Sequence, residues 1–208
     1  MTELELLKAE VEKRLSAFRF LHTIGVADAA KALAKELLPE KEKELIAAAY
    51  LHDIAKELPT EELISLSKEY GYEPNSDDIS SPQVLHAFAA PSVIKKDFSA
   101  FATDDIMSSV FKHTTGDSEM SLFDEIIFIS DYIEEGRKYP SCIEVRKDLY
   151  ENLRLSSNIT EKEYALHKAV LKSIEYTLES LNIKNKSVNP KTLAAKTHIE
   201  EKIAGIVL

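Results

Sequence analysis

The sequence predicts an all-α protein, and three observations carry that prediction. Apolar residues recur at intervals of three or four positions along nearly all of the chain, which is the spacing of one helix face. No stretch alternates convincingly between apolar and polar residues at the two-residue period of a strand. Turn residues are scarce, with five glycines and seven prolines among 208 residues, which argues against a turn-rich β-sandwich. At this length we expect one domain spanning residues 1–208.

The first half of the chain contains four helical patterns with recognisable boundaries. We expect helices over about residues 4–15, 19–38, 40–55 and 60–70. Thr2 and Glu5 form a capping box ahead of the first helix, because each side chain can bond to the backbone N–H of the other. Pro39 ends the second helix. Gly71 follows the fourth, where a glycine can adopt the left-handed conformation that closes a helix.

Residues 71–82 have the most loop-like composition, because Asn, Asp, Ser, Gly and Pro cluster there. A helical pattern resumes at Pro82 and is interrupted at Pro91. Later helices are expected over about 103–113, 121–136, 140–153 and 160–181, followed by a short last helix from Asn189-Pro190. The predicted capping pairs are Ser121 with Asp124 and Thr160 with Glu163. The sequence therefore predicts about eight to ten helices.

Composition excludes several classes of function. None of the glycines belongs to a Rossmann or P-loop phosphate-binding pattern. The net charge of −10 repels nucleic acids, so we expect no nucleic-acid partner. Cys142 is the single cysteine, which rules out a thiolate metal cluster. The chain has no apolar run long enough to cross a membrane and no apolar signal core, so we expect a cytoplasmic protein with no membrane partner.

Six residues have the chemistry of a metal site, because imidazole and carboxylate groups are common metal ligands. They are His22, His52, Asp53, His86, His113 and Asp131. They come from five different predicted helices or helix ends, so only the fold can bring them together. The His52-Asp53 pair and Asp131 stand among apolar residues, in AAAYLHDIAK and IIFISDYI. A buried carboxylate without a partner is unstable, which favours a nearby cation.

Each of these residues also has a simpler interpretation. A histidine on an apolar helix face is more often a hydrogen-bonded core residue than a ligand. Asp131 could be a helix residue paired with Arg137, and a His-Asp pair occurs by chance in roughly a third of such sequences. His167 and His198 lack a comparable context, and we interpret both as structural residues. The order of the six residues, rather than any one of them, favours a metal site.

This order of residues resembles the HD-domain superfamily of metal-dependent phosphohydrolases. Finer motifs resemble one branch, the YqeK family of symmetrical diadenosine tetraphosphate hydrolases. Those motifs are RFLHTIGV, LHDIAK, HTTG and SDYIEEGR. The chain departs from the family at Leu85, where Trp is common, and at Glu135, where Pro is common. The resemblance implies a single HD domain with a core over about 18–138, onto which the helices of 140–208 pack.

The resemblance further implies a di-iron centre. Asp53 would bridge the two ions. One ion would be completed by His22, His52 and Asp131, and the other by His86 and His113. The residue types alone suit iron, manganese, cobalt or zinc equally. Two such ions activate water and stabilise the charge on a phosphoryl group.

Positive side chains lie close to the predicted ligands in the sequence. They are Arg19, Lys56 and Arg137. Phosphoryl transfer needs such groups on its non-bridging and leaving oxygens, although solvated charge on a helix is the commoner role. Thr114 either donates to a phosphate or caps the helix that ends beside it, and the resemblance alone places Thr177 near the nucleotide. We assign Asp53 and Lys56 to catalysis, and substrate contacts to Arg19, Lys56, Thr114, Asp131, Arg137 and Thr177.

The resemblance implies an enzyme that hydrolyses diadenosine tetraphosphate symmetrically to two ADP with metal-activated water. Its partner is then a small dinucleoside polyphosphate, and an acidic helical surface is compatible with a homodimer. Two alternatives stay open. One is an HD-type phosphohydrolase that acts on a nucleoside monophosphate or a cyclic nucleotide. The other is a non-catalytic helical module that binds a nucleotide or a metal.

Overall fold

A computed structural model describes residues 1–206 and confirms the all-α class, because no strand occurs in that part of the chain. The elements are α1 (Glu3–Arg14), α2 (Ala17–Leu37), η1 (Pro39–Lys41), α3 (Glu42–Leu51), α4 (Thr60–Tyr70), α5 (Ser76–Ser80), α6 (Pro82–Asp97), η2 (Ser99–Phe101), α7 (Asp104–Lys112), α8 (Leu122–Ile133), α9 (Pro140–Leu155), α10 (Ile159–Ile183) and α11 (Pro190–Gly205). The last two residues of the predicted 1–208 domain lie outside the described residues.

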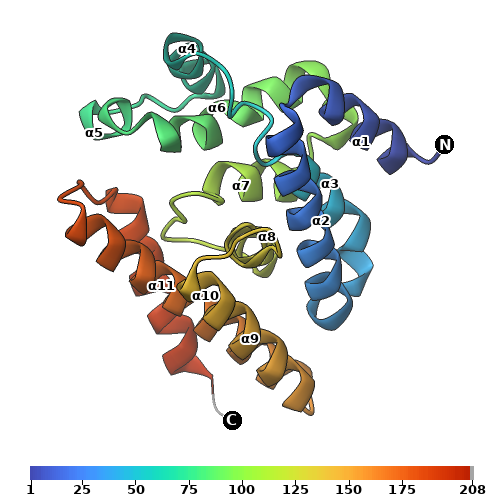
Figure 1. Ribbon diagram of the computed structural model, residues 1–208, viewed down its shortest axis with the longest axis vertical. Coiled ribbons are helices and arrows are strands. Elements are labelled where there is room, and N and C mark those ends of the chain that lie inside the picture. The colour runs from blue at the N-terminus through green and yellow to red at the C-terminus, as the bar shows by residue number, and fades with distance from the viewer. Residues whose placement is uncertain (207–208) are drawn as a thin grey trace.

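Helix α8 is the centre of the fold. Figure 1 shows it nearly end-on, with α2 and α3 on one side and α9, α10 and α11 below. It contacts α2, α3, α7, α9 and α10, and its residues 123–130 are all buried. One apolar core extends from Leu7 in α1 to Ile199 in α11, so the C-terminal helices share it with the preceding ones. The polar groups of these buried residues are therefore surrounded by other helices.

Local capping chemistry formed as predicted at three helix ends. Both hydrogen bonds of the Thr2–Glu5 capping box are present at the start of α1. Those of the Ser121 and Asp124 box are present at the start of α8. Gly71 closes α4 with φ of 98°, a left-handed conformation that costs glycine little. These signals were readable because each depends on residues only a few positions apart.

Within residues 1–206 the fold has eleven α-helices, not eight to ten. One addition is α5, inside the segment 71–82 that we predicted as a loop. Asp78 in α5 is fully buried and accepts hydrogen bonds from the Tyr72 hydroxyl and from Asn189 Nδ2 at the start of α11. The last helix, predicted to be short, has 16 residues because Ala195 and Ile199 pack into the core. Both errors arise from contacts between distant segments.

Two other local predictions were wrong. Pro91 does not interrupt its helix, because α6 continues through it to Asp97. An interior proline costs roughly 3 kcal/mol, and the burial of all ten residues of 85–94 offsets that cost. The N-cap of α10 is Asn158, whose side chain accepts from the Glu161 backbone N–H, rather than Thr160. Asparagine is at least as good an N-cap as threonine, so the earlier position prevails.

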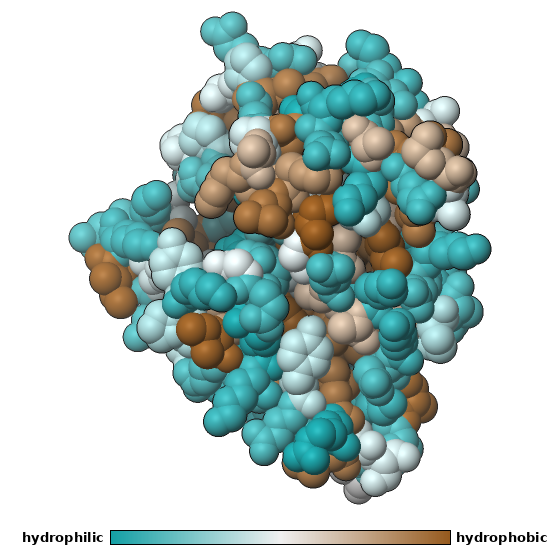
Figure 2. Space-filling model, turned by 45° about the vertical axis from the view of Figure 1, so that its right-hand side comes forward, coloured by the Kyte–Doolittle hydropathy of each residue, from teal (hydrophilic) through white to brown (hydrophobic). Residues whose placement is uncertain are grey.

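The face in Figure 2 is covered mainly by hydrophilic side chains, with smaller groups of hydrophobic ones between them. This agrees with the 36 acidic and 26 basic side chains of the sequence. Among residues 1–206, no helix has both the length and the apolar character needed to cross a membrane.

A buried carboxylate joins α8 to the last two helices. The Glu125 side chain is fully buried, and its oxygens lie 2.6 Å from His167 Nδ1 and 2.5 Å from Lys202 Nζ. His167 is therefore a hydrogen-bonded core residue, as we interpreted it. His198 also has a structural role, since its Nε2 accepts from the Met120 backbone N–H at 3.1 Å.

We expect Glu125→Gln to lower the free energy of unfolding by about 2 kcal/mol. Glutamine can still accept from His167, but it leaves the Lys202 ammonium without its counter-charge. Urea unfolding followed by far-UV circular dichroism measures the loss. An unchanged unfolding midpoint would show that this ion pair contributes nothing to stability.

Candidate metal centre

Five helices deliver the predicted ligands to one place. His22 lies in the first half of α2, His86 in the first half of α6, and Asp131 in the last turn of α8. His52 and His113 stand at the C-terminal caps of α3 and α7. The side chains of all five residues form one contiguous cluster with that of Asp53.

Asp53 lies between two groups of imidazoles. Its Oδ2 faces His22 and His52, whose Nε2 atoms are 3.8 and 3.5 Å away. Its Oδ1 faces His86 and His113, whose Nε2 atoms are 2.9 and 3.7 Å away. The ligand atoms of each group lie within 4.8 Å of one another. The structure therefore offers two candidate cation positions, on either side of one carboxylate.

Asp131 joins the first of these two groups. Its Oδ1 lies 3.0 Å from His22 Nε2 and 3.9 Å from His52 Nε2. The same oxygen accepts a hydrogen bond from Arg137 at 2.5 Å. The two sequence-based interpretations of Asp131 are thus compatible, because it is both paired with Arg137 and adjacent to the imidazoles.

The imidazoles are oriented with their Nε2 atoms toward the carboxylates. His52 Nδ1 lies 2.7 Å from the Ala49 carbonyl oxygen, and His113 Nδ1 lies 2.7 Å from that of Val110. A carbonyl can only accept, so each Nδ1 donates and each neutral ring keeps its lone pair on Nε2. The Nε2 atoms of His22 and His52 are buried and have no hydrogen-bond partner. Ring nitrogens without a hydrogen-bond partner that lie this close to carboxylate oxygens fit a bound cation.

The protonation states agree with a cation site. Burial lowers the pKa of His113 and takes that of His86 down to about 3, so both rings are neutral near pH 7. Burial alone would raise the pKa of Asp53, but the surrounding imidazoles outweigh it and hold that pKa well below its ordinary range. Burial also lowers the pKa of His52, yet the Asp53 carboxylate outweighs burial and the net shift is upward. The cluster therefore attracts positive charge.

Three basic side chains surround the cluster where the sequence placed them. Arg19 donates to Asp53 Oδ2 at 2.7 Å, and Arg137 donates to Asp131. Lys56 Nζ lies 3.7 Å from Asp53 Oδ1, and burial lowers its pKa. All three groups are thus close enough to the candidate cation positions to contact an anion bound there.

The two predicted threonine contacts differ in position. Thr114 Oγ1 lies 3.0 Å from His113 Nε2 and 3.4 Å from His86 Nε2, so its hydroxyl faces the cluster and caps no helix. Thr177 lies on α10, where its hydroxyl donates to the Ser173 carbonyl. No hydrogen bond between described residues connects Thr177 to the cluster, and its contact with the nucleotide stays a prediction.

Sequence reasoning missed Glu134, which contacts the Nδ1 atom of His22 on the side of the ring away from the cluster. His22 Nδ1 lies 3.2 Å from Oε1 of Glu134, which is buried at the end of α8. Arg146 on α9 holds this chain segment through hydrogen bonds to the carbonyls of Ile133, Glu134 and Arg137. The available signal was the glutamate within SDYIEEGR, next to residues already assigned to the site.

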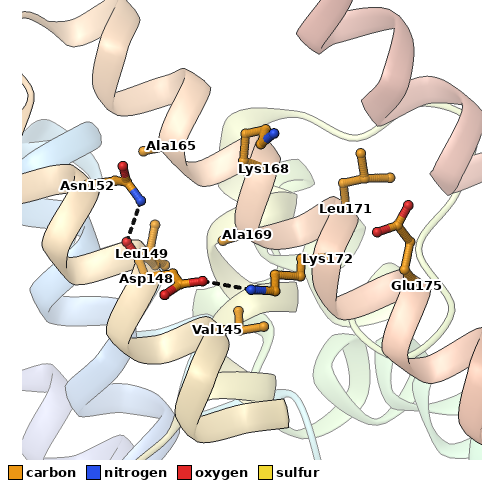
Figure 3. Close-up of a pocket in the computed structure, with 10 residues that line it drawn as sticks. All are labelled: Val145, Asp148, Leu149, Asn152, Ala165, Lys168, Ala169, Leu171, Lys172 and Glu175. Carbon is orange, nitrogen blue, oxygen red and sulfur yellow. Dashed lines mark hydrogen bonds and ion pairs between the residues drawn. The ribbon is translucent and has the colours of Figure 1, made fainter.

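A separate groove lies between α9 and α10 (Figure 3). It has a volume of about 330 Å³ and is lined by Asp148, Asn152, Lys168, Lys172, Glu175 and five apolar residues. Figure 3 shows the Lys172 ammonium directed at Asp148, and their atoms are 2.7 Å apart. None of the predicted site residues lines this groove, so it is separate from the cluster.

The two departures from the resembled family leave the cluster intact. Leu85 is fully buried in α6, next to His86 in the chain. The Glu135 side chain is 80% exposed and lies 3.5 Å from Arg146. Neither residue has a polar contact with a predicted ligand among the described interactions.

The family comparison agrees with the fold and covers the part of the chain that contains the cluster. A family model described as HD domain matches residues 19–136, more than half of the chain, and this range contains all six predicted ligands. The chain belongs to the HD domain family. It is accordingly a hydrolase of that family, built as an all-helical bundle.

Two relatives and one solved structure are similar over nearly the whole chain. The relatives, from Bacillus subtilis and Halalkalibacterium halodurans, are both named "Bis(5'-nucleosyl)-tetraphosphatase, symmetrical". The first is 30% identical over 88% of this chain and 89% of its own, and the second is 31% identical over 88% and 90%. The solved structure is described as a "predicted HD superfamily hydrolase involved in NAD metabolism from Clostridium acetobutylicum". It has a TM-score of 0.81 and 29% identity, and the match covers 97% of this chain and 99% of that one.

Proposed function

We propose that the chain hydrolyses diadenosine tetraphosphate symmetrically to two ADP at a dinuclear centre. The observation that carries this proposal is the position of Asp53 between two groups of imidazoles. The names of the two relatives support the choice of substrate. The alternative substrates and the non-catalytic module become outcomes of the test below.

In this proposal the six residues hold two cations. Asp53 would help to hold both of them. His22, His52 and Asp131 complete the first set, and His86 and His113 complete the second. When bound, the two cations lower the pKa of a water molecule and stabilise charge on the phosphoryl group. Iron follows from the resemblance, while the donor set also suits manganese, cobalt or zinc.

The reaction forms one bond and breaks another. A water oxygen bonds to one of the two central phosphorus atoms, the bond from that phosphorus to the central bridging oxygen breaks, and the water protons are shared between products and solvent. Arg19, Arg137 and Thr114 donate to non-bridging oxygens, and the Lys56 ammonium stabilises the leaving oxygen. Such fixed donors need no reorganisation as charge develops. The role of Thr177, a homodimer and a cytoplasmic location remain predictions.

The test is a product assay on protein reconstituted with iron(II), manganese(II), cobalt(II) or zinc(II). We expect ADP as the sole nucleotide product, resolved by anion-exchange chromatography. ATP with AMP, or no turnover with any of the four metals, would contradict the proposal. A panel of nucleoside monophosphates and cyclic nucleotides tests the second substrate class. Nucleotide binding that survives His52→Ala, without any product from the unmodified protein, would indicate a binding module.

A further inference from the structure

Three of the predicted ligand histidines have an Nδ1 atom that contacts an oxygen, and the three are not oriented in the same way. His52 and His113 each donate to the carbonyl three residues earlier in their own helix. Both stand at helix C-termini, where the last carbonyls have no intrahelical partner and are free to accept. His22 lies inside α2, where the carbonyls already accept helix hydrogen bonds. Its orientation therefore depends on a group from outside its helix.

That group is the Glu134 carboxylate. Its Oε1 lies 3.2 Å from His22 Nδ1, and its Oε2 accepts from the Gly136 backbone N–H at 2.5 Å. The side chain is 5% exposed. A Cβ atom at Gly25 or Gly136 would come within 2.5 or 2.7 Å of Oε2, so the two glycines make room for the carboxylate. The fold thus encloses the Glu134 carboxylate next to the Nδ1 atom of His22.

We propose that Glu134 is a positioning residue for the first cation of the proposed dinuclear site, on which this inference rests. An ionised carboxylate only accepts, so it keeps the proton of the neutral ring on Nδ1 and leaves the lone pair on Nε2. It also makes that ring a stronger ligand. Glu134 does not orient a histidine of the second cation position. There, His113 is oriented by a backbone carbonyl.

The experiment is a titration of metal-free protein with cobalt(II), followed by calorimetry and by visible absorption of the bound ion. We expect two sites in the unmodified protein. Glu134→Ala should weaken one of them by about 10- to 100-fold and leave the other unchanged. Glu134→Gln should weaken that site less than Glu134→Ala does. Its amide has one acceptor oxygen, whereas the carboxylate uses one oxygen for His22 and the other for Gly136.

Two further variants separate positioning from a general loss of structure. Gly25→Ala keeps Glu134 but places a methyl group against its carboxylate, so it should weaken the same site even if Glu134→Ala folds poorly. Glu125→Gln is the matched control, because Glu125 is also a buried carboxylate bonded to a histidine Nδ1 but contacts none of the predicted ligands. It should bind two cobalt ions with unchanged affinity.

The outcomes distinguish this inference from the proposed function. Two cobalt sites of unchanged affinity in both Glu134→Ala and Gly25→Ala would overturn the positioning role and leave the dinuclear proposal standing. An unmodified protein that binds no metal would overturn the dinuclear proposal itself. Equal weakening of one site in Glu125→Gln and in Glu134→Ala would also overturn the positioning role, because the loss would then follow from stability alone.

Discussion

An Asp53→Asn variant should lose both cations and hydrolyse diadenosine tetraphosphate at least about 10³-fold more slowly. Asparagine keeps the shape of the side chain but removes its charge, and it replaces one oxygen with a nitrogen that cannot bind a cation. Because the two Asp53 oxygens face separate groups of histidines, one substitution affects both cation positions. The measurements are kcat and the metal content per chain by elemental analysis.

Asp124→Asn provides the matched control for this variant. Asp124 is a second buried aspartate with a basic partner, since its Oδ2 lies 2.9 Å from Lys112 Nζ. It belongs to the capping box of α8, where it accepts from the Ser121 backbone N–H, and it contacts none of the predicted ligands. This variant should lose stability while it keeps two cations and an unchanged kcat. An Asp53→Asn protein with a normal rate and a normal metal content would remove Asp53 from the proposed centre.

The sequence predicts helices best where the signal is local. Capping boxes and the glycine that closes α4 depend on residues a few positions apart, and they formed as expected. The continuation of α6 through Pro91 depends instead on neighbours from other helices that bury it. Helix α5 likewise depends on the contact between Asp78 and Asn189, which are 111 residues apart. A pattern read along one chain contains no record of such partners.

The same limit explains which part of the site could be predicted. Ligand candidates stood out because histidine and aspartate interrupt apolar helix faces. Glu134 did not, because it is followed by another glutamate in a charged segment. In the fold, the side chain of Glu134 is 5% exposed and that of Glu135 is 80% exposed. Whether Glu134 or Glu135 faces the histidines is decided by where α8 ends and by the turn that Arg146 holds.

Both arginines near the cluster already contact carboxylates of predicted ligands, so each needs a further N–H donor to contact a phosphate. Arg19 donates to Asp53 and Arg137 to Asp131 through one nitrogen each. A guanidinium has five N–H donors, so one bond leaves most of them free. Arg19 Nε is buried without a partner, which marks an unused donor beside the cluster. Each arginine can therefore hold a ligand carboxylate in place and still contact a phosphate, which a lysine could do less well.

Removal of the cations should abolish hydrolysis and leave the helices folded. The apolar core runs from Leu7 to Ile199 without any of the predicted ligands, so the fold has its own source of stability. Metal that binds only the folded state stabilises it by about 2.7 kcal/mol when its concentration is 100 times its dissociation constant. For a chain of this size that corresponds to a Tm lower by roughly 5 to 10 °C in the metal-free protein.

The experiment is dialysis against a chelator, followed by scanning calorimetry, circular dichroism and the product assay. We expect unchanged helicity, the lower Tm, and a loss of at least about 10³-fold in rate, all reversed when a suitable divalent metal is added back. Full activity in protein shown to be free of metal would contradict the dinuclear proposal. Loss of helicity would contradict the independence of the core, because the cations would then be needed for folding and not only for the reaction.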